Sequence, residues 1–474
     1  MLLDTMMDNV NRPPDESKTI VWTTAARYRI GMTALTFSGC LLLLLLVLDT
    51  STRRTTSRQL DGEMEDTASI LLPQMTIGAY YYPWYVADNN FHNGNYVRQL
   101  LSQQPQLGEY DQSNKKVIDQ HLKWSQYANI GLWVTSWWGP NKQTDLVIKN
   151  VILKAIEGTT HKIALLYETS NRMAGSGNKN ENATTSDRTH RIIDDISYIC
   201  ETYFSHPNYY HIQGRPVLVV YVTRVLDDVE GLLEESLLLA RTAAAKKGFM
   251  IYLIGDQAFG KPPITENGIM TPEAKAFEYL DAVTNYDVYG TMGRGYAGKD
   301  AVDEYYGNQI TWRRLAMNED CGFIPSVTPG FNDYGVRFEA NHTPLSRRLS
   351  ATKPEGSFFA ASLKRAVRQT DSATGNLVLV NSFNEWHEDT QIEPCIGPST
   401  DQPYNLTTGL MYEGYGNLYL DILKRMTPLA ALDSPGSSKT DREANNKDKR
   451  TKRTRGSRRY YDVIDEGEEK DVNH

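Results

Sequence analysis

Eight short apolar segments recur along residues 74–428, and stretches with helical periodicity separate them. Each segment is rich in aliphatic, β-branched or aromatic residues, which is typical of a buried strand. The segments are Met75–Tyr82, Ile130–Ser136, Lys162–Tyr167, Pro216–Val222, Phe249–Gly255, Ala282–Tyr289, Phe323–Val327 and Leu377–Phe383. The helical stretches are Lys115–Ala128, Asp145–Glu157, Arg188–Phe204, Asp228–Lys246, Glu304–Met317, Ser357–Gln369 and Tyr415–Arg425. Strands that alternate with helices in this way predict βαβ units and a parallel sheet.

The number of repeats decides between the two common parallel-sheet folds. Eight repeats in about 350 residues fit a (β/α)8 TIM barrel with long loops. A doubly wound open sheet would usually carry a glycine-rich phosphate-binding turn after its first strand. The residues at that place, Pro83-Trp84-Tyr85, contain no glycine. We therefore predict an α/β protein whose residues 74–428 form a (β/α)8 barrel.

A single strongly apolar run precedes the predicted barrel. Residues 30–48 carry no charge and approach the ~20 residues that a helix needs to cross a bilayer. A cleaved signal peptide has a shorter apolar region of about 7–15 residues, so we predict a transmembrane signal anchor. Arginines flank the run on both sides and leave its orientation open. The glycosylation acceptors Asn182, Asn341 and Asn405 all follow it, which favours a barrel in the lumen.

Composition assigns the segments outside the barrel. Residues 1–29 are predicted to be a cytoplasmic tail, and residues 49–73, rich in Thr, Ser and charged residues, a stem. Residues 429–474 are too polar to bury a core and are predicted to be disordered. Their basic block at Lys447–Arg459 could bind a polyanion, although a solvated tail fits its composition better. The net charge of −8 argues against a nucleic-acid partner.

Cysteine usage points to neither metal nor thiol chemistry. Cys40 lies in the apolar run, whereas Cys200, Cys321 and Cys395 lie beyond it, so at most one disulfide can form among these three. No cysteine or histidine spacing is typical of zinc. We predict no metal or other cofactor, and we interpret the three cysteines as small buried hydrophobic residues.

Aromatic and polar residues follow the predicted strands, where a barrel builds its active site. Aromatic faces stack on sugar rings, while carboxylates, amides and guanidinium groups bind hydroxyls. The residues at these strand ends are Tyr81-Tyr82-Pro83-Trp84-Tyr85, Trp137-Trp138-Gly139-Pro140, Tyr167-Glu168, Asn285-Tyr286-Asp287, Pro329-Gly330-Phe331-Asn332-Asp333 with Arg337, and Asn384-Glu385-Trp386-His387-Glu388. This set predicts a carbohydrate site.

Glu385 and Glu388 form the sharpest motif. Residues three apart share one face of a helical turn, with Cβ atoms ~5–6 Å apart. Retaining glycosidases hold their carboxyl groups ~5–5.5 Å apart and inverting ones ~6.5–9.5 Å apart, so the spacing favours retention. Two carboxylates this close cannot both ionise freely, so one pKa is expected to rise. Two alternatives stay open: a polar surface turn, and a metal site that includes His387 but lacks a second ligand cluster.

The segment Ser382–Pro394 resembles the signature of glycoside hydrolase family 99, the endo-α-mannosidases and related endo-α-mannanases. The resemblance covers nearly all of residues 75–425, with the motifs in the order of the family. The other matching motifs are Gly78–Tyr85, Ser136–Gly139, Val327–Asp333 and Arg337.

The resemblance implies distinct roles for the two glutamates. Glu385 would act as a base on the 2-hydroxyl of the substrate, giving a 1,2-anhydro sugar that water opens with net retention. Glu388 would be the general acid that protonates the leaving oxygen and then activates the water. This chemistry suits α-mannosides, whose axial 2-hydroxyl lies opposite the leaving group.

The resemblance also implies a substrate-binding set. Tyr286 matches the tyrosine beside the reacting sugar, and Trp138 the aromatic platform for the next sugar outward. The hydroxyl-binding shell of the family matches Tyr82, Glu168, Arg337 and Asn384. From their places after the strands, Trp84, Trp386 and His387 complete the candidate site.

Two positions depart from the common pattern of the family. Asp389 stands where many relatives have Gly, a loop change from which we expect little effect on the carboxylates. Trp138 is typical of mannan-cleaving relatives, whereas enzymes that accept glucose there tend to carry a smaller aromatic residue. The resemblance therefore supports the reaction more firmly than it supports a glucosylated substrate.

The expected protein is a retaining endo-α-1,2-mannosidase acting on high-mannose glycans of glycoproteins, with or without terminal glucose. It is expected to be a single-pass type II protein of the Golgi membrane, with a luminal catalytic domain. One alternative is an inactive lectin-like barrel, which would lack one carboxylate. The other is an anchored glycosyltransferase, but Asp194-Asp195 and Asp227-Asp228 fall on predicted helices and not at strand ends.

Overall fold

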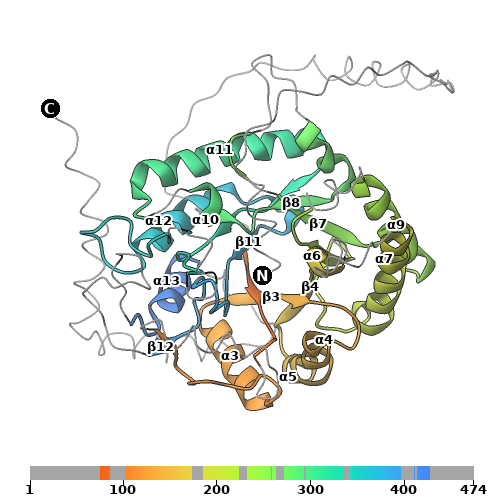
Figure 1. Ribbon diagram of the computed structural model, residues 1–474, viewed down its shortest axis with the longest axis horizontal. Coiled ribbons are helices and arrows are strands. Elements are labelled where there is room, and N and C mark those ends of the chain that lie inside the picture. The colour runs from red at the N-terminus through yellow and green to blue at the C-terminus, as the bar shows by residue number, and fades with distance from the viewer. Residues whose placement is uncertain are drawn as a thin grey trace, which may run out of the picture. The chain divides into compact units, whose positions relative to one another are not determined.

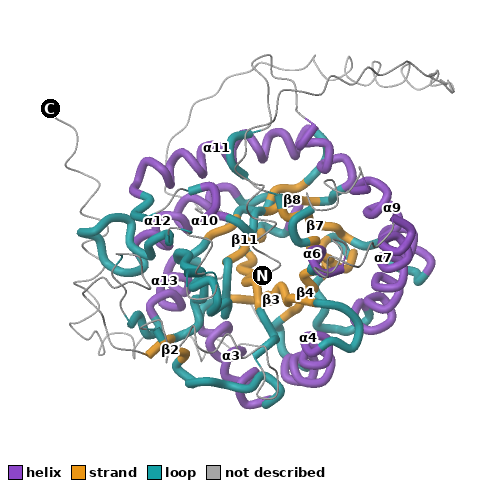
Figure 2. Tube along the Cα trace, in the orientation of Figure 1, coloured by secondary structure: helices purple, strands orange, loops and turns teal. Residues whose placement is uncertain are grey.

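The described part of the chain is an α/β unit in which parallel strands lie inside a ring of helices (Figures 1 and 2). The computed structural model describes residues 75–85, 103–172, 185–223, 232–257, 259–262, 272–292, 295–334, 337, 342, 344–396, 410 and 414–427. The predictions that lie outside these residues concern segments 1–29, 30–48, 49–73 and 429–474 and the acceptors Asn182, Asn341 and Asn405. Within the described residues, no helix is long and apolar enough to cross a membrane.

Nine parallel strand segments make the barrel. They are β1 (Thr76–Tyr81), β3 (Ile130–Trp137), β4 (Lys162–Tyr167), β6 (Arg215–Val220), β7 (Tyr252–Asp256), β8 (Ala282–Thr284), β9 (Gly322–Phe323), β10 (Ser326–Val327) and β11 (Leu377–Val380). Their order in the sheet is β10-β11-β1-β3-β4-β6-β7-β8-β9, and every pair along it is parallel.

The seventh strand position closes this sheet. Only Ile324 and Pro325 separate β9, which pairs with β8, from β10, which pairs with β11. The two ends of the ordered sheet therefore meet on one short segment. Proline has no backbone N–H, which explains why the predicted strand Phe323–Val327 is divided there. The arrangement fits the predicted (β/α)8 barrel, and each predicted strand segment overlaps a barrel strand.

Helices cover the outside of the barrel (Figure 1). The helical elements are α3 (Lys115–Tyr127), α4 (Gln143–Val147), η2 (Ile148–Ile152), α5 (Leu153–Ile156), α6 (Thr169–Arg172), α7 (Thr185–Ile199), η3 (Cys200–Phe204), α9 (Leu232–Lys246), η4 (Pro272–Tyr279), α10 (Val288–Thr291), α11 (Gly298–Asn318), α12 (Ser357–Ala366), η6 (Val367–Gln369), η7 (Ser372–Thr374) and α13 (Leu418–Met426). Two short antiparallel pairings involve β2 (Gln104–Pro105) with β12 (Cys395–Ile396), and β5 (His211–Ile212) with β6.

Helix periodicity located the helices but did not predict their irregularities. The predicted helix Asp145–Glu157 is divided by the π-helical turn η2, and the predicted helix Arg188–Phe204 ends in the π-helical turn η3. The predicted strand Ala282–Tyr289 was too long, because β8 ends at Thr284 and α10 begins at Val288. The Asp287 side chain caps α10 by accepting a hydrogen bond from the Gly290 N–H, which explains this early change of direction.

The core lies on both faces of the strands, as a parallel sheet covered by helices requires. Gly78 on β1 is needed because a Cβ there would lie 2.8 Å from Cδ2 of Leu379. Cys200, Cys321 and Cys395 are buried and unpaired, which confirms their interpretation as buried hydrophobic residues. Burial raises the pKa of Cys200 and that of Cys395 to about 11, so both thiols stay protonated at neutral pH.

Candidate active site

The segment that carries the two glutamates is an irregular turn after β11. The spacing argument assumed a helical turn, whereas residues 384–389 form no helix and residues 386–389 form a hydrogen-bonded turn. Instead the Trp386 N–H donates to the Asn384 carbonyl (3.1 Å), and the Thr390 N–H to the Glu385 carbonyl (3.2 Å). The Glu385 N–H donates to Ser382 Oγ at 2.8 Å. Contacts between side chains and backbone therefore set the turn.

Glu388 is held by donors from two other parts of the barrel. Arg337 Nη1 and Nη2 each lie 3.3 Å from Oε1. The hydroxyls of Tyr286 and Tyr289 donate to Oε2 at 3.3 and 3.4 Å. Burial raises the pKa of Glu388 to about 7, with a further rise from the charge of Glu385 and an opposing effect of Arg337. Glu388 can therefore both donate and accept a proton near neutral pH, as a general acid/base must.

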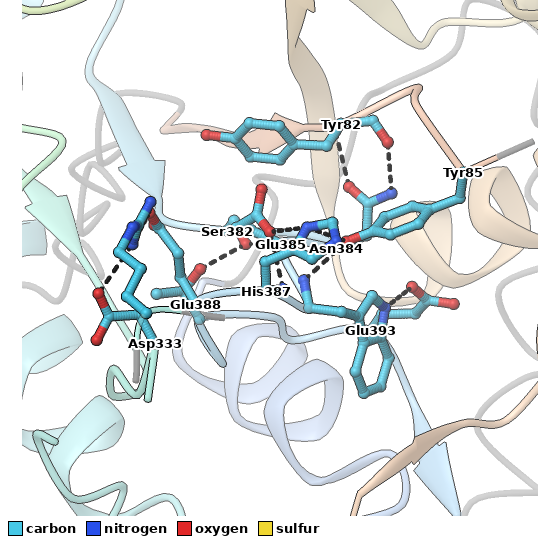
Figure 3. Close-up of polar contacts among 12 residues, drawn as sticks. Tyr82, Tyr85, Asp333, Ser382, Asn384, Glu385, His387, Glu388 and Glu393 are labelled. Carbon is cyan, nitrogen blue, oxygen red and sulfur yellow. Dashed lines mark hydrogen bonds and ion pairs between the residues drawn. The ribbon is translucent and has the colours of Figure 1, made fainter. Parts of the chain in front are cut away.

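A second carboxylate fixes Arg337 in place. Arg337 Nη1 donates to Asp333 Oδ2 at 2.9 Å (Figure 3). His342 Nδ1 lies 2.7 Å from the same oxygen. The neighbouring charges of Glu388 and Asp333 outweigh burial and raise the pKa of Arg337, so the guanidinium stays charged. The Asn332 N–H donates to the Glu388 carbonyl at 2.8 Å. The segment after β10 thus positions both the side chain and the backbone of Glu388.

Glu385 is oriented by its own turn. The His387 N–H and His387 Nδ1 approach Glu385 Oε1 at 2.9 and 3.0 Å. The Tyr85 ring stacks on His387 with centroids 5.5 Å apart, and the Tyr85 hydroxyl accepts the Trp386 N–H at 3.0 Å. One oxygen of Glu385 is thus engaged from within the turn (Figure 3).

Asn384 joins this turn to the end of β1. Its Oδ1 accepts the Tyr82 N–H at 2.8 Å, and its Nδ2 donates to the Tyr82 carbonyl at 2.9 Å, across 302 residues of sequence (Figure 3). The Tyr82 hydroxyl donates to the Tyr286 hydroxyl at 2.6 Å. Tyr82, Asn384 and Tyr286, predicted from three different strand ends, therefore meet beside Glu388.

Trp138 and Glu168 are linked through a serine on β3. The Ser136 hydroxyl donates to Glu168 Oε1 at 2.6 Å, and Trp138 Nε1 donates to Ser136 Oγ at 2.8 Å. Burial raises the pKa of Glu168 to about 8, and the charges of Glu385 and Glu388 act in the same direction. Glu168 is therefore largely protonated at neutral pH and can donate a hydrogen bond.

Trp84 lies among the other predicted aromatic residues. Its ring centroid is 4.5 Å from that of Tyr82, 5.7 Å from that of His387 and 6.1 Å from that of Trp138. These rings connect the surroundings of Glu385 with those of Trp138. An aromatic wall of this kind suits the apolar face of a sugar.

Trp386 has the contacts of a supporting residue and not those of a sugar platform. Its indole is 1% exposed, and Nε1 donates to Glu393 Oε2 at 2.8 Å (Figure 3). The Tyr110 hydroxyl donates to the same oxygen at 2.8 Å, while His121 Nε2 lies 3.2 Å from Oε1. The predicted sugar contact of Trp386 finds no support in these distances, which show the indole held on the core side of the turn.

Several residues of the site were not singled out as site residues from the sequence. Tyr289 follows Tyr286 by three residues, so helical spacing could have placed it on the same side. Asp256 ends β7, where its Oδ1 accepts the Tyr286 N–H at 2.6 Å and its Oδ2 accepts the Val222 N–H at 3.0 Å. Its position at a strand end was the available signal. The bridging role of Ser136 had no sequence signal.

Asp389 was expected to be a loop change with little effect on the carboxylates. Its φ of 52° is left-handed, a conformation that favours glycine. The buried Arg347 donates from Nη2 to the Asp389 carbonyl at 2.9 Å and to its Oδ1 at 3.1 Å. The same nitrogen donates to the Gln391 carbonyl at 3.1 Å. This ion pair ties the residue after Glu388 to the loop before α12.

Metal ligation was an open alternative for the Glu385–Glu388 motif. Over the residues that the structure describes, no group of three or more His, Cys, Asp or Glu side chains is arranged to hold a metal ion. Arg337 and two tyrosines instead surround Glu388. Hydrogen-bond donors of this kind suit a carboxyl group that exchanges protons. The contacts of Glu388 therefore favour the acid/base interpretation of the motif.

A closed parallel barrel with two glutamates after its last strand, and with aromatic and cationic side chains around them, defines a glycoside hydrolase architecture. The family model for glycosyl hydrolase family 99 matches residues 80–245 and 284–426, well over half of the chain. The chain therefore belongs to glycosyl hydrolase family 99. This confirms the resemblance found in the sequence.

Curated relatives and solved structures agree with this membership. The glycoprotein endo-α-1,2-mannosidase of Mus musculus is 23% identical over 329 residues, covering 68% of this chain and 62% of the relative. The glycoprotein endo-α-1,2-mannosidase-like protein of Homo sapiens is 24% identical over 336 residues, with 68% and 63% covered. The chain thus spans less than two thirds of their length. A solved glycoside hydrolase-like protein, 18% identical, shares the fold with a TM-score of 0.54, covering 76% of this chain and 95% of that one.

Proposed function

We propose that this protein is a retaining endo-α-mannosidase that hydrolyses α-1,2 linkages within mannose-containing glycans. The observation that carries the proposal is Glu388, a buried carboxyl with a pKa of about 7, held by Arg337, Tyr286 and Tyr289 beside a second glutamate, Glu385. The mouse relative is a glycoprotein endo-α-1,2-mannosidase and the human relative is an endo-α-1,2-mannosidase-like protein, which supports mannose glycans as the substrate class.

In the first step Glu385 accepts the proton of the substrate 2-hydroxyl. The 2-oxygen forms a bond to C1 from the face opposite the leaving oxygen, and the bond from C1 to that oxygen breaks. Glu388 gives its proton to the leaving oxygen, which departs as an alcohol. The contact of His387 with Glu385 Oε1 leaves the second carboxylate oxygen, Oε2, for the 2-hydroxyl. The product of this step is a 1,2-anhydro sugar.

In the second step Glu388, now ionised, accepts a proton from water, which attacks C1 and opens the anhydro ring. Glu385 returns its proton to the 2-oxygen. Two inversions at C1 give net retention. The pKa of Glu388 near 7 suits both steps, because the same group must donate a proton and then accept one.

The sugar bound outside the reacting mannose is proposed to rest on Trp138, with Glu168 on its hydroxyls. We propose a glycan of the high-mannose type on glycoproteins as the natural substrate. Residues 30–48 are proposed to anchor the protein in the Golgi membrane with the barrel in the lumen, as their sequence predicts.

The test is glycan profiling of the products from Man9 and Glc1Man9 substrates. Release of a mannose-containing disaccharide or larger saccharide with retained α-configuration is the expected result. Glu385→Gln and Glu388→Gln should each abolish turnover while glycan binding persists, and Glu235→Gln, at an exposed position on α9, should be fully active. Near-normal turnover by either active-site variant, or release of single mannoses from chain ends, would contradict the proposal.

A further inference from the structure

One serine hydroxyl connects two candidate sugar-binding side chains of different kinds. Ser136 Oγ donates to Glu168 Oε1 at 2.6 Å and accepts from Trp138 Nε1 at 2.8 Å. A hydroxyl has one hydrogen and two lone pairs, so these two contacts use it in a single orientation. Ser136 is fully buried, and Glu168 is 4% exposed. The bridge is therefore shielded from competing water.

We propose that Ser136 is a positioning residue that determines specificity for the sugar bound next to the reacting mannose. It fixes the Trp138 indole, the stacking surface, relative to the Glu168 carboxyl, the hydroxyl ligand. The inference rests on the proposed function, because it assigns this bridge to the outer sugar of the same site. A sugar whose apolar face and hydroxyl match that fixed geometry binds well, and one that does not match is disfavoured.

The backbone at Trp138 is already fixed from the outside of the barrel. The Trp138 N–H donates to Thr144 Oγ1 at 3.3 Å. On the same loop Trp137 Nε1 donates to Asp145 Oδ1 at 2.9 Å, and the Asn141 N–H donates to Asp145 Oδ2 at 2.9 Å. The freedom left to Trp138 is rotation of its side chain, and the bond to Ser136 removes it.

The bridge formed by Ser136 extends from the proposed catalytic glutamates, Glu385 and Glu388, towards Trp84. Glu385 and Glu388 are both close enough to Glu168 for their charges to raise its pKa. At the other end, the half-buried Trp138 ring lies 6.1 Å from the Trp84 ring. Glu168, Ser136 and Trp138 therefore span the distance from the reacting sugar to its neighbour, which is where a choice between glucose and mannose would be made.

The experiment is a double-mutant cycle with Ser136→Ala and Trp138→Phe, the latter keeping an aromatic ring but losing the N–H. The substrates are an aryl α-mannoside extended outward by glucose or by mannose, and the same mannoside without extension. Each single change should lower kcat/KM about 10-fold on the preferred extended substrate, through KM, as expected for one lost hydrogen bond. The double variant should lose no more than the larger single loss, and the unextended substrate should be nearly unaffected.

Ser125→Ala provides the matched control. Ser125 is also fully buried and accepts an indole N–H, from Trp133 Nε1 at 2.9 Å, but it lies on α3, outside the site. This change should lower the melting temperature without altering KM or the choice between extended substrates. If Ser136→Ala lowers only the melting temperature, as Ser125→Ala should, Ser136 has only a structural role and the inference is wrong. The inference is also wrong if the losses of kcat/KM in Ser136→Ala and Trp138→Phe are additive in the double variant.

A binding arm separates this inference from the proposed function. In the Glu388→Gln background, titration calorimetry measures binding of glucosyl-mannose and mannosyl-mannose disaccharides without turnover. Ser136→Ala should weaken binding of the preferred disaccharide about 10-fold and so reduce the difference in affinity between the two disaccharides. If the parent protein binds a disaccharide selectively but the wild type hydrolyses no glycan, the proposed function fails and the inference stands. Binding of neither disaccharide, or unchanged selectivity in Ser136→Ala, overturns the inference.

Discussion

The pH range of activity should move in opposite directions when Arg337 and Asp333, the two charged residues near Glu388, are replaced in turn. Arg337 lowers the pKa of Glu388, and Asp333 raises it. A general acid is active while protonated, so activity falls as the pH rises through its pKa. Arg337→Met should therefore move the alkaline fall of kcat/KM to higher pH, and Asp333→Asn should move it to lower pH, relative to the wild-type value near 7.

The size of the shift follows from the contact geometry. Arg337 Nη2 lies 3.3 Å from Glu388 Oε1. At an effective dielectric constant of ~20, two unit charges at this distance interact by roughly 5 kcal/mol. One pKa unit corresponds to ~1.36 kcal/mol, which sets an upper limit of about 3–4 units. Arginine–carboxylate pairs typically shift a pKa by ~1–3 units, so we expect a rise of that size in Arg337→Met. Asp333→Asn removes a more distant charge and should give a smaller shift, of about 1 unit or less.

The assay is kcat/KM against pH from about 5 to 10 on an α-mannoside substrate, with the folded fraction checked by circular dichroism at each pH. Arg337 is also expected to bind a sugar hydroxyl, so the rate of Arg337→Met will fall as well; the position of the alkaline limb, and not its height, is the readout. Arg337→Lys keeps the charge and should restore much of the wild-type position. An alkaline limb that stays in place in both variants, or that moves in the same direction in both, would refute Glu388 as the general acid.

The remaining predictions concern stability, support, topology and cofactor. The folded-state pKa of Glu168, about 8, lies above its unfolded value of 4.5, so the stability that it contributes is fully present below pH 4.5 and is lost as the pH rises through 8. Glu168→Gln should therefore have a higher free energy of unfolding than wild type at pH 9, by up to about 5 kcal/mol, but not at pH 4, as measured by urea unfolding. Glu393→Gln should lower both kcat and melting temperature, because it weakens the contact with His121. Asp389→Gly should remove the strain of a left-handed backbone at a non-glycine residue but also remove the carboxylate that pairs with Arg347. The free energy of unfolding in urea should fall by about 1–3 kcal/mol, and a rise would contradict this prediction. Replacing residues 1–60 with a cleavable signal peptide should give secreted, active protein, and treatment with EDTA should leave activity unchanged.

The fold was largely predictable because each barrel strand is buried on both faces and so appears as an apolar segment. The boundaries were less predictable where a single residue intervened. Pro325 divides the seventh strand, and the Asp287 cap turns the end of β8 into α10. Neither effect changes the hydrophobic pattern on which the prediction relied.

The site was predictable to the extent that strand ends meet at one end of a barrel. Glu388, Tyr286 and Arg337 follow three different strands, β11, β8 and β10, and the structure brings them together. What each side chain contacts could not be predicted in the same way. Ser136 has no periodicity that marks it as a bridge, because its role depends on the rotamers of Glu168 and Trp138.

The turn that carries Glu385 and Glu388 is held by its own hydrogen bonds and also by side chains that anchor it to its surroundings. Within six residues, every second or third side chain is tied to a different part of the barrel: Asn384 to the end of β1, Trp386 to Glu393, and Asp389 to Arg347. Glu385 and Glu388, which alternate with these anchors, are left directed towards the site (Figure 3). In a helix, with about 100° per residue, Trp386 and Asp389 would share a face but Asn384 would lie on another, so the three anchors could not all point into the core. The irregular turn thus leaves two carboxyl groups available for the proposed reaction while their neighbours hold them in place.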